Sequence, residues 1–156
     1  MKQGFAIMII GWIFMFCPIH GYTLDMDNLF WVHMGGSAMI LGSDIVATTH
    51  TFSTYKGETF KPVRTLLLTQ TLVTGELVLF GVITRFFLKY GKAKKIMRGI
   101  HMGIGIASTL LHCVTLIPMH KTISPSNAPT PFIFGYLSAG LSFSSAGMMM
   151  LIRYVI

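Results

Sequence analysis

Residues 98–120 read RGIHMGIGIASTLLHCVTLIPMH, and this stretch decides the class of fold. Its first residue is the only Lys, Arg, Asp or Glu that it contains. A helix needs about 20 predominantly apolar residues to cross the hydrocarbon core of a bilayer. The stretch therefore predicts a transmembrane helix over about 99–119, broken near Pro118, where the proline ring removes a backbone donor.

Four further apolar stretches lie on either side of this one. Of all residues 53% are hydrophobic and only 11% charged, against about 25% charged in an ordinary soluble domain. The unbroken apolar runs favour helices over a membrane barrel. We predict an all-α, multi-pass membrane protein that is one domain over residues 1–156. Its core is expected to be a four-helix bundle of the last four stretches, with the first helix peripheral. The spans are about 4–19, 28–50, 65–88, 99–119 and 131–156.

The distribution of charge predicts how the chain lies in the membrane. The formal net charge is +7, and a basic segment runs from Lys89 to Arg98. Lys and Arg are enriched in cytoplasmic loops, so this segment is expected inside and the N-terminus outside, in a bacterial inner membrane or an organelle membrane. We expect lipid, and not nucleic acid, to be the partner of these charges. Cys17 and Cys113 lie in apolar runs and indicate neither a disulfide framework nor a Cys-rich zinc site.

Ionisable side chains inside the spans are costly and are therefore candidates for function. His33 and His101 lie near the start of the second and fourth spans, which run in the same direction because one helix intervenes. Asp44 and His112 each follow eleven residues later, which is about three turns on the same helix face and about 16 Å along the axis. The two histidines are thus predicted to share one depth, and Asp44 and His112 a second depth.

Two imidazoles on facing helices are natural axial ligands for a haem iron. We therefore predict one haem b between His33 and His101, with Arg98 placed to bind its propionates. Small residues one or two turns from the ligands would let the helices hold a flat macrocycle. These residues are Ser37, Gly105 and Ser108. The competing interpretation is that the histidines and small residues only mediate close packing of helices.

The second depth leaves more than one interpretation open. His112, with His50 as its partner, would hold a second haem, although Asp44 occupies the position that matches His112 in the earlier span. Glu76 lies near the centre of the third span, at about the depth of Asp44 and His112. We expect Asp44 and Glu76 to handle protons there, in a relay, a quinone site or a metal site. The alternative is a buried polar network whose members neutralise one another.

The segment from Arg98 to Gly105, followed by His112, resembles that of the small haem-b membrane cytochromes. His33, which follows Trp31, is similar to the facing ligand of such proteins. The resemblance implies a four-helix bundle with histidine ligands on facing helices that passes electrons to or from a quinone. The chain departs from the pattern at Asp44, where a second pair of ligands would require histidine.

We therefore expect an electron-transfer subunit, at most the membrane cytochrome subunit of an oxidoreductase. It would work with other membrane or peripheral redox subunits, in a larger complex or as a homo-oligomer. One alternative is a proton or metal-ion carrier that uses Asp44, Glu76 and His112 without haem. Another is an accessory or pigment-binding subunit of a membrane complex, because a membrane histidine also ligates chlorin magnesium.

Overall fold

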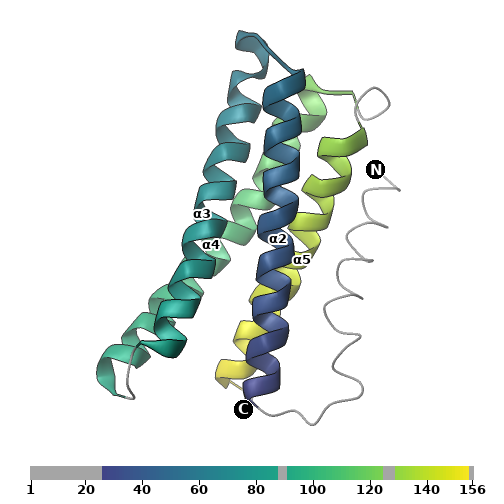
Figure 1. Cartoon of the computed structure of the whole chain (residues 1–156). Helices are drawn as coiled ribbons and strands as arrows, with labels where there is room; N and C mark the ends of the chain where they lie inside the picture. Colours follow the sequence, from purple (N-terminus) through teal and green to yellow (C-terminus); the bar gives the residue numbers. More distant parts are fainter. Residues whose placement is uncertain (1–25, 88–90, 125–128, 155–156) are drawn as a thin grey trace.

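The computed structural model describes residues 26–87, 91–124 and 129–154, and this part of the chain is entirely helical, without strands (Figure 1). The predicted all-α class is confirmed for it. A short 3-10 turn, η2 (Glu58–Phe60), precedes the second long helix. The predicted first helix, 4–19, lies outside the described residues. The four long helices are α2 (Met26–Thr54), α3 (Lys61–Phe86), α4 (Lys92–Thr122) and α5 (Pro129–Tyr154).

The ends of the helices differ from the apolar runs that predicted them. The basic residues before Gly99 form the first turns of α4, because Lys and Arg are good helix formers and can extend into water. The predicted break at Pro118 is wrong, since α4 continues to Thr122. A proline near the end of a helix costs few backbone bonds, and the Thr122 hydroxyl donates to the Pro118 carbonyl at 2.8 Å. Gly91, with φ 148°, begins α4 in a conformation that glycine adopts without strain.

The helices alternate in direction and close into a ring of contacts. The helices α2 and α4 each pack against both α3 and α5, and α2 and α4 run the same way, as predicted (Figure 1). At the end where α2 begins, α3 and α4 lean away from α2 and α5 (Figure 1).

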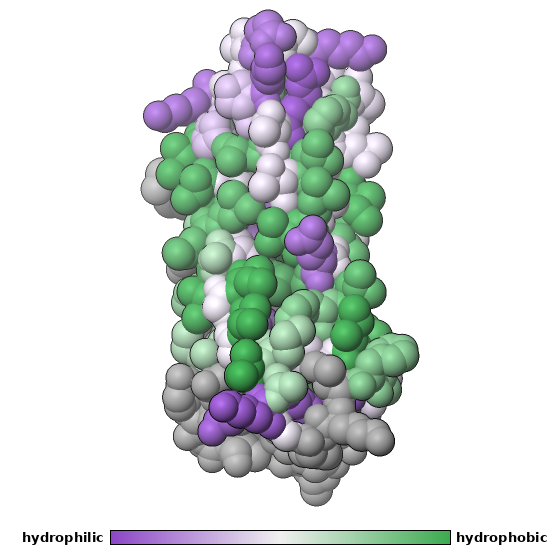
Figure 2. Space-filling model, turned by 90° about the vertical axis from the view of Figure 1, so that its left-hand side faces the viewer, coloured by the Kyte–Doolittle hydropathy of each residue, from purple (hydrophilic) through white to green (hydrophobic). Residues whose placement is uncertain are grey.

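Three of the described helices are long and apolar enough to cross a membrane, which is consistent with a membrane protein. They are the segments Glu58–Phe86, Lys92–Thr122 and Pro129–Met150. Figure 2 shows hydrophobic side chains over the middle of one face and hydrophilic ones gathered at an end. The predicted span in α2 is not among the three, because α2 carries many polar residues. Several of these are buried against the other helices, including Ser43, Asp44, Thr48 and Thr51.

The interior combines two small apolar clusters with an unusual number of buried hydroxyl groups. Ala47, Leu67 and Met119 belong to a cluster near the α2–α3 turn, and Ile40 and Leu141 to a second one. Many of the buried hydroxyls donate to a carbonyl one turn earlier in their own helix, as Thr109 does to Gly105 at 3.0 Å. Small and hydroxyl residues let membrane helices approach closely, so the interior is suited to tight packing around polar groups.

Candidate functional site

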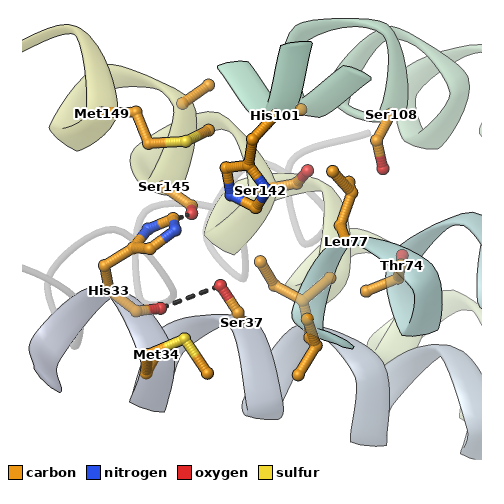
Figure 3. Close-up of a pocket in the computed structure, with 14 residues that line it drawn as sticks. His33, Met34, Ser37, Thr74, Leu77, His101, Ser108, Ser142, Ser145 and Met149 are labelled. Carbon is orange, nitrogen blue, oxygen red and sulfur yellow. Dashed lines mark hydrogen bonds between the residues drawn. The ribbon is translucent and has the colours of Figure 1, made fainter. Parts of the chain in front are cut away.

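A partly open cavity of about 40 Å³ lies between all four helices, toward the end where α2 begins. Two imidazoles, His33 of α2 and His101 of α4, point into it, together with the thioethers of Met34 and Met149 (Figure 3). The remaining wall consists mainly of small or hydroxyl side chains, among them Ser37, Gly105, Ser108, Ser142, Ser145 and Ala146. The cavity therefore presents nitrogen and sulfur ligands within a wall of small, hydroxyl-bearing and aliphatic side chains, the last being Ile40, Leu77 and Val78.

The structure brings His33 and His101 together. Their ring centroids are 6.1 Å apart, with an angle of 81° between the planes. The Nδ1 atom of His33 lies 3.0 Å from the hydroxyl oxygen of Ser145. When this nitrogen carries the ring proton, it donates to Ser145 and leaves the lone pair of Nε2 free for a metal. In that tautomer the contact with Ser145 orients the ring of His33.

The ring of His101 is oriented by stacking and has no hydrogen bond from any described residue. It stacks on Phe80 of α3, with ring centroids 5.8 Å apart and 13° between the planes. Its Nδ1 atom is buried without a partner in the described part of the chain. A buried nitrogen without a partner is uncommon and calls for an explanation such as a bound ion or cofactor.

Two glycines lie beside side chains of the site, and Gly105 is the one whose lack of a Cβ atom permits a close approach. A Cβ atom on Gly81 would lie 3.5 Å from Cε1 of His101 and 3.7 Å from the sulfur of Met34. A Cβ atom on Gly105 would lie 2.7 Å from the terminal methyl of Met149. Sequence reasoning placed Gly105 near the site, but missed Gly81, Phe80 and Ser145. The small residues of the last helix carried a signal, but they were interpreted as a packing surface.

The two imidazoles are suitable ligands for a haem iron, but the cavity is too small to hold the macrocycle. A pocket for a drug-sized molecule has a volume of about 300–1,000 Å³, so a macrocycle does not enter a cavity of about 40 Å³ without movement of its walls. Met34 and Met149 are the walls best able to move, because their side chains are unbranched and flexible. Met149 lies directly against Gly105, where its displacement would open a slot beside the backbone of α4.

A second polar site lies deeper between the helices, around the carboxylate of Asp44, which is completely buried. Its Oδ1 atom accepts hydrogen bonds from Gln70 Nε2 at 2.6 Å and from the Ser138 hydroxyl. Its Oδ2 atom accepts from the Thr74 hydroxyl at 2.8 Å and lies 3.1 Å from Nε2 of His112. All four helices therefore contribute to one hydrogen-bond network around a single carboxylate.

The hydrogen bonds of His112 indicate how many protons the Asp44 and His112 side chains hold between them. Its Nδ1 atom lies 2.7 Å from the carbonyl oxygen of Ser108; that oxygen only accepts, so Nδ1 carries a proton. The contact from Nε2 to Asp44 is a hydrogen bond only when one further proton lies between them, on either atom. The pair then has no net charge, which is the least costly way to bury two ionisable groups.

Three predicted residues are not brought into these sites. Glu76 is exposed on the outer surface of α3, so it does not join Asp44 and His112. The described residues contain no group of three or more His, Cys, Asp or Glu side chains that could hold a metal ion. Both ring nitrogens of His112 bond within the protein, so it has none left for a second haem with His50. Arg98 is exposed, one turn before His101 on α4.

The two sites share a wall. Thr74 and Ser108 line the cavity of His33 and His101, and each also belongs to the Asp44 network, Thr74 through its hydroxyl and Ser108 through its carbonyl. The network therefore holds in place the part of the cavity wall that Thr74 and Ser108 form.

Comparisons of the chain with protein-family models, with curated proteins and with solved structures found no match.

Proposed function

We propose that the protein is a multi-pass membrane subunit that transfers electrons by means of haem b bound between His33 and His101. In this proposal the four described helices form a four-helix bundle in the membrane, and residues 4–19 add a fifth, peripheral helix. The observation that carries the proposal is the pair of imidazoles, 6.1 Å apart, that two non-adjacent helices present to one cavity. Bound haem would supply one-electron redox chemistry at its iron.

The residues around the cavity have separate roles in this proposal. His33 and His101 bind the iron, Ser145 holds the orientation of His33, and Phe80 holds the plane of His101. The side chains of Met34 and Met149 move aside to make room for the macrocycle. Arg98, at the exposed start of α4, is in reach of propionates at the membrane edge. In this proposal oxidation of a substrate belongs to a partner, with a quinone or a redox subunit as the electron donor or acceptor.

The proposal is tested by the absorption spectrum of the purified protein before and after reduction with dithionite. We expect reducible bands of a haem with two imidazole ligands, and one haem b per chain by pyridine haemochrome assay. Metal analysis of the same sample should find iron in equal amount. A featureless spectrum from protein expressed with sufficient haem would exclude the proposal.

Removal of the Ser145 hydroxyl tests the orienting role of that residue. The variant Ser145→Ala should bind haem about 10–100-fold more weakly, the usual cost of losing a group that orients a metal-bound histidine. Ser144→Ala is the matched control, because the Ser144 hydroxyl is also buried but donates to the Gly140 carbonyl and not to the cavity. Titration of haem into the apo-protein measures both affinities, and equal values would argue against this role.

A second candidate function is the binding of copper(I) in the same cavity, and the small volume of the cavity favours it. A volume of about 40 Å³ accommodates a bare metal ion without movement of the walls. Two imidazoles with two thioethers are a ligand set that suits copper(I). This candidate predicts stoichiometric copper, no haem bands, and loss of the metal in Met149→Leu. The same spectrum and metal analysis therefore separate it from the haem proposal.

A further inference from the structure

The outer face of α3 carries one ionisable group among large apolar side chains. Glu76 is exposed, and exposed apolar residues continue on both sides of it along the same face. Together the five side chains lie within about 80° around the helix axis. The apolar members are Leu68, Leu72, Leu79 and Ile83, which are 43%, 60%, 61% and 39% exposed. Between Arg64 and Arg85 the only charged residue of α3 is Glu76.

Glu76 is in an unfavourable position if this face meets lipid. A charged side chain near the bilayer centre is costly, because the hydrocarbon core does not solvate it. Two of the polar residues of α3 that face inward, Gln70 and Thr74, bond to Asp44, whereas no described residue bonds to the Glu76 carboxylate. A polar group in a membrane helix is normally satisfied by a neighbouring helix. A partner outside the described part of the chain would satisfy this carboxyl group.

We propose that the covering partner is a second copy of this chain, with the α3 helices packed along this face and the two Glu76 carboxyl groups hydrogen-bonded to each other. A protonated carboxyl both donates and accepts one hydrogen bond, so it is complementary to itself. Two copies inserted in the same direction, related by a two-fold axis along the membrane normal, present Glu76 at the same depth automatically. The 4-4-3-4 spacing from Leu68 to Ile83 is close to that of the seam between paired helices.

Cross-linking of cysteine pairs in the membrane tests where the copies meet. Both native cysteines are first replaced, as Cys17→Ser and Cys113→Ser, and Leu72→Cys or Leu110→Cys is then added. Leu110 lies on α4 and is as exposed as Leu72, at 62% against 60%. On oxidation we expect disulfide-linked dimers from Leu72→Cys and few or none from Leu110→Cys. Monomers at both positions, equal dimers at both, or cross-links of Leu72→Cys to another protein would overturn the proposal.

Substitution of Glu76 tests the carboxyl pair itself. Glu76→Gln should preserve the dimer, because an amide also donates and accepts. Glu76→Leu should weaken dimerisation about tenfold, the effect of losing one inter-helix polar contact in a membrane. Sedimentation in detergent and the Leu72→Cys cross-linking yield measure the change, and circular dichroism confirms that the helices remain formed. Equal dimerisation of the Gln and Leu variants would overturn the carboxyl pair. The result does not depend on haem binding, which is measured separately.

Discussion

The variants His33→Ala and His101→Ala should each purify without the haem absorption that the unaltered protein is expected to show. Each removes one of the two imidazoles that face each other across the cavity, and the haem would then lose one of the two axial bonds that this proposal assigns to it. Haem content by pyridine haemochrome assay is the measurement. His33→Gly and His101→Gly offer a sharper form of the test, because added imidazole can occupy the space of the missing ring and should restore binding.

The other histidines serve as controls for this prediction. His120 is exposed and bonds to the Tyr136 hydroxyl, and His50 does not line the cavity. Both His120→Ala and His50→Ala should therefore retain the full haem content. Retention of haem by both His33→Ala and His101→Ala, or its loss from the controls alone, would show that the ligands lie elsewhere.

Replacement of Asp44 with alanine should lower the free energy of unfolding by about 3–5 kcal/mol, the usual cost of removing one member of a buried ion pair. The substitution leaves Gln70, Ser138 and His112 without their common acceptor in an interior that excludes water. Unfolding of the protein in mixed micelles, followed by circular dichroism, measures the loss. Glu58→Ala is the control, because the Glu58 and Lys61 side chains are 85% and 66% exposed and such a pair contributes about 0–1 kcal/mol.

A double-mutant cycle separates the Asp44–His112 contact from the rest of the network. If the two residues share a proton, Asp44→Ala should cost about 0.5–3 kcal/mol less when His112 is already alanine, the range for residues in one network. Additive losses would show that the two side chains do not act as a pair. In that case the stability of the network would come from Gln70, Thr74 and Ser138.

The axial positions of the polar residues could be predicted from spacing alone. A helix rises 1.5 Å per residue, so counting along two parallel spans places His33 beside His101 and Asp44 beside His112, and both pairs meet in the structure. The same counting placed Glu76 at the depth of Asp44 but could not establish the side of α3 on which it lies. Glu76 is rotated about 200° from Thr74, the inward residue two positions earlier, and it is therefore exposed.

The partners of these residues could not be predicted, because they come from segments distant in the sequence. Ser138 reaches Asp44 across 94 positions, and Ser145 reaches His33 across 112. In the sequence each is one of many serines in an apolar stretch, with no pattern that singles it out. Only the packing of α5 against α2 shows which of these hydroxyls face the buried ionisable groups.

The amino-acid sequence by itself determined that the described chain is helical, that it contains helices apolar enough to cross a membrane, and that His33 and His101, and likewise Asp44 and His112, lie at matching heights on two parallel helices. These properties depend on local hydropathy and on the rise of a helix, which neighbouring segments hardly change. Tertiary structure alone decided how each helix is rotated about its axis. That rotation separates the buried Asp44–His112 pair from the exposed Glu76, because it is set by contacts between helices and not by the residues of any one helix.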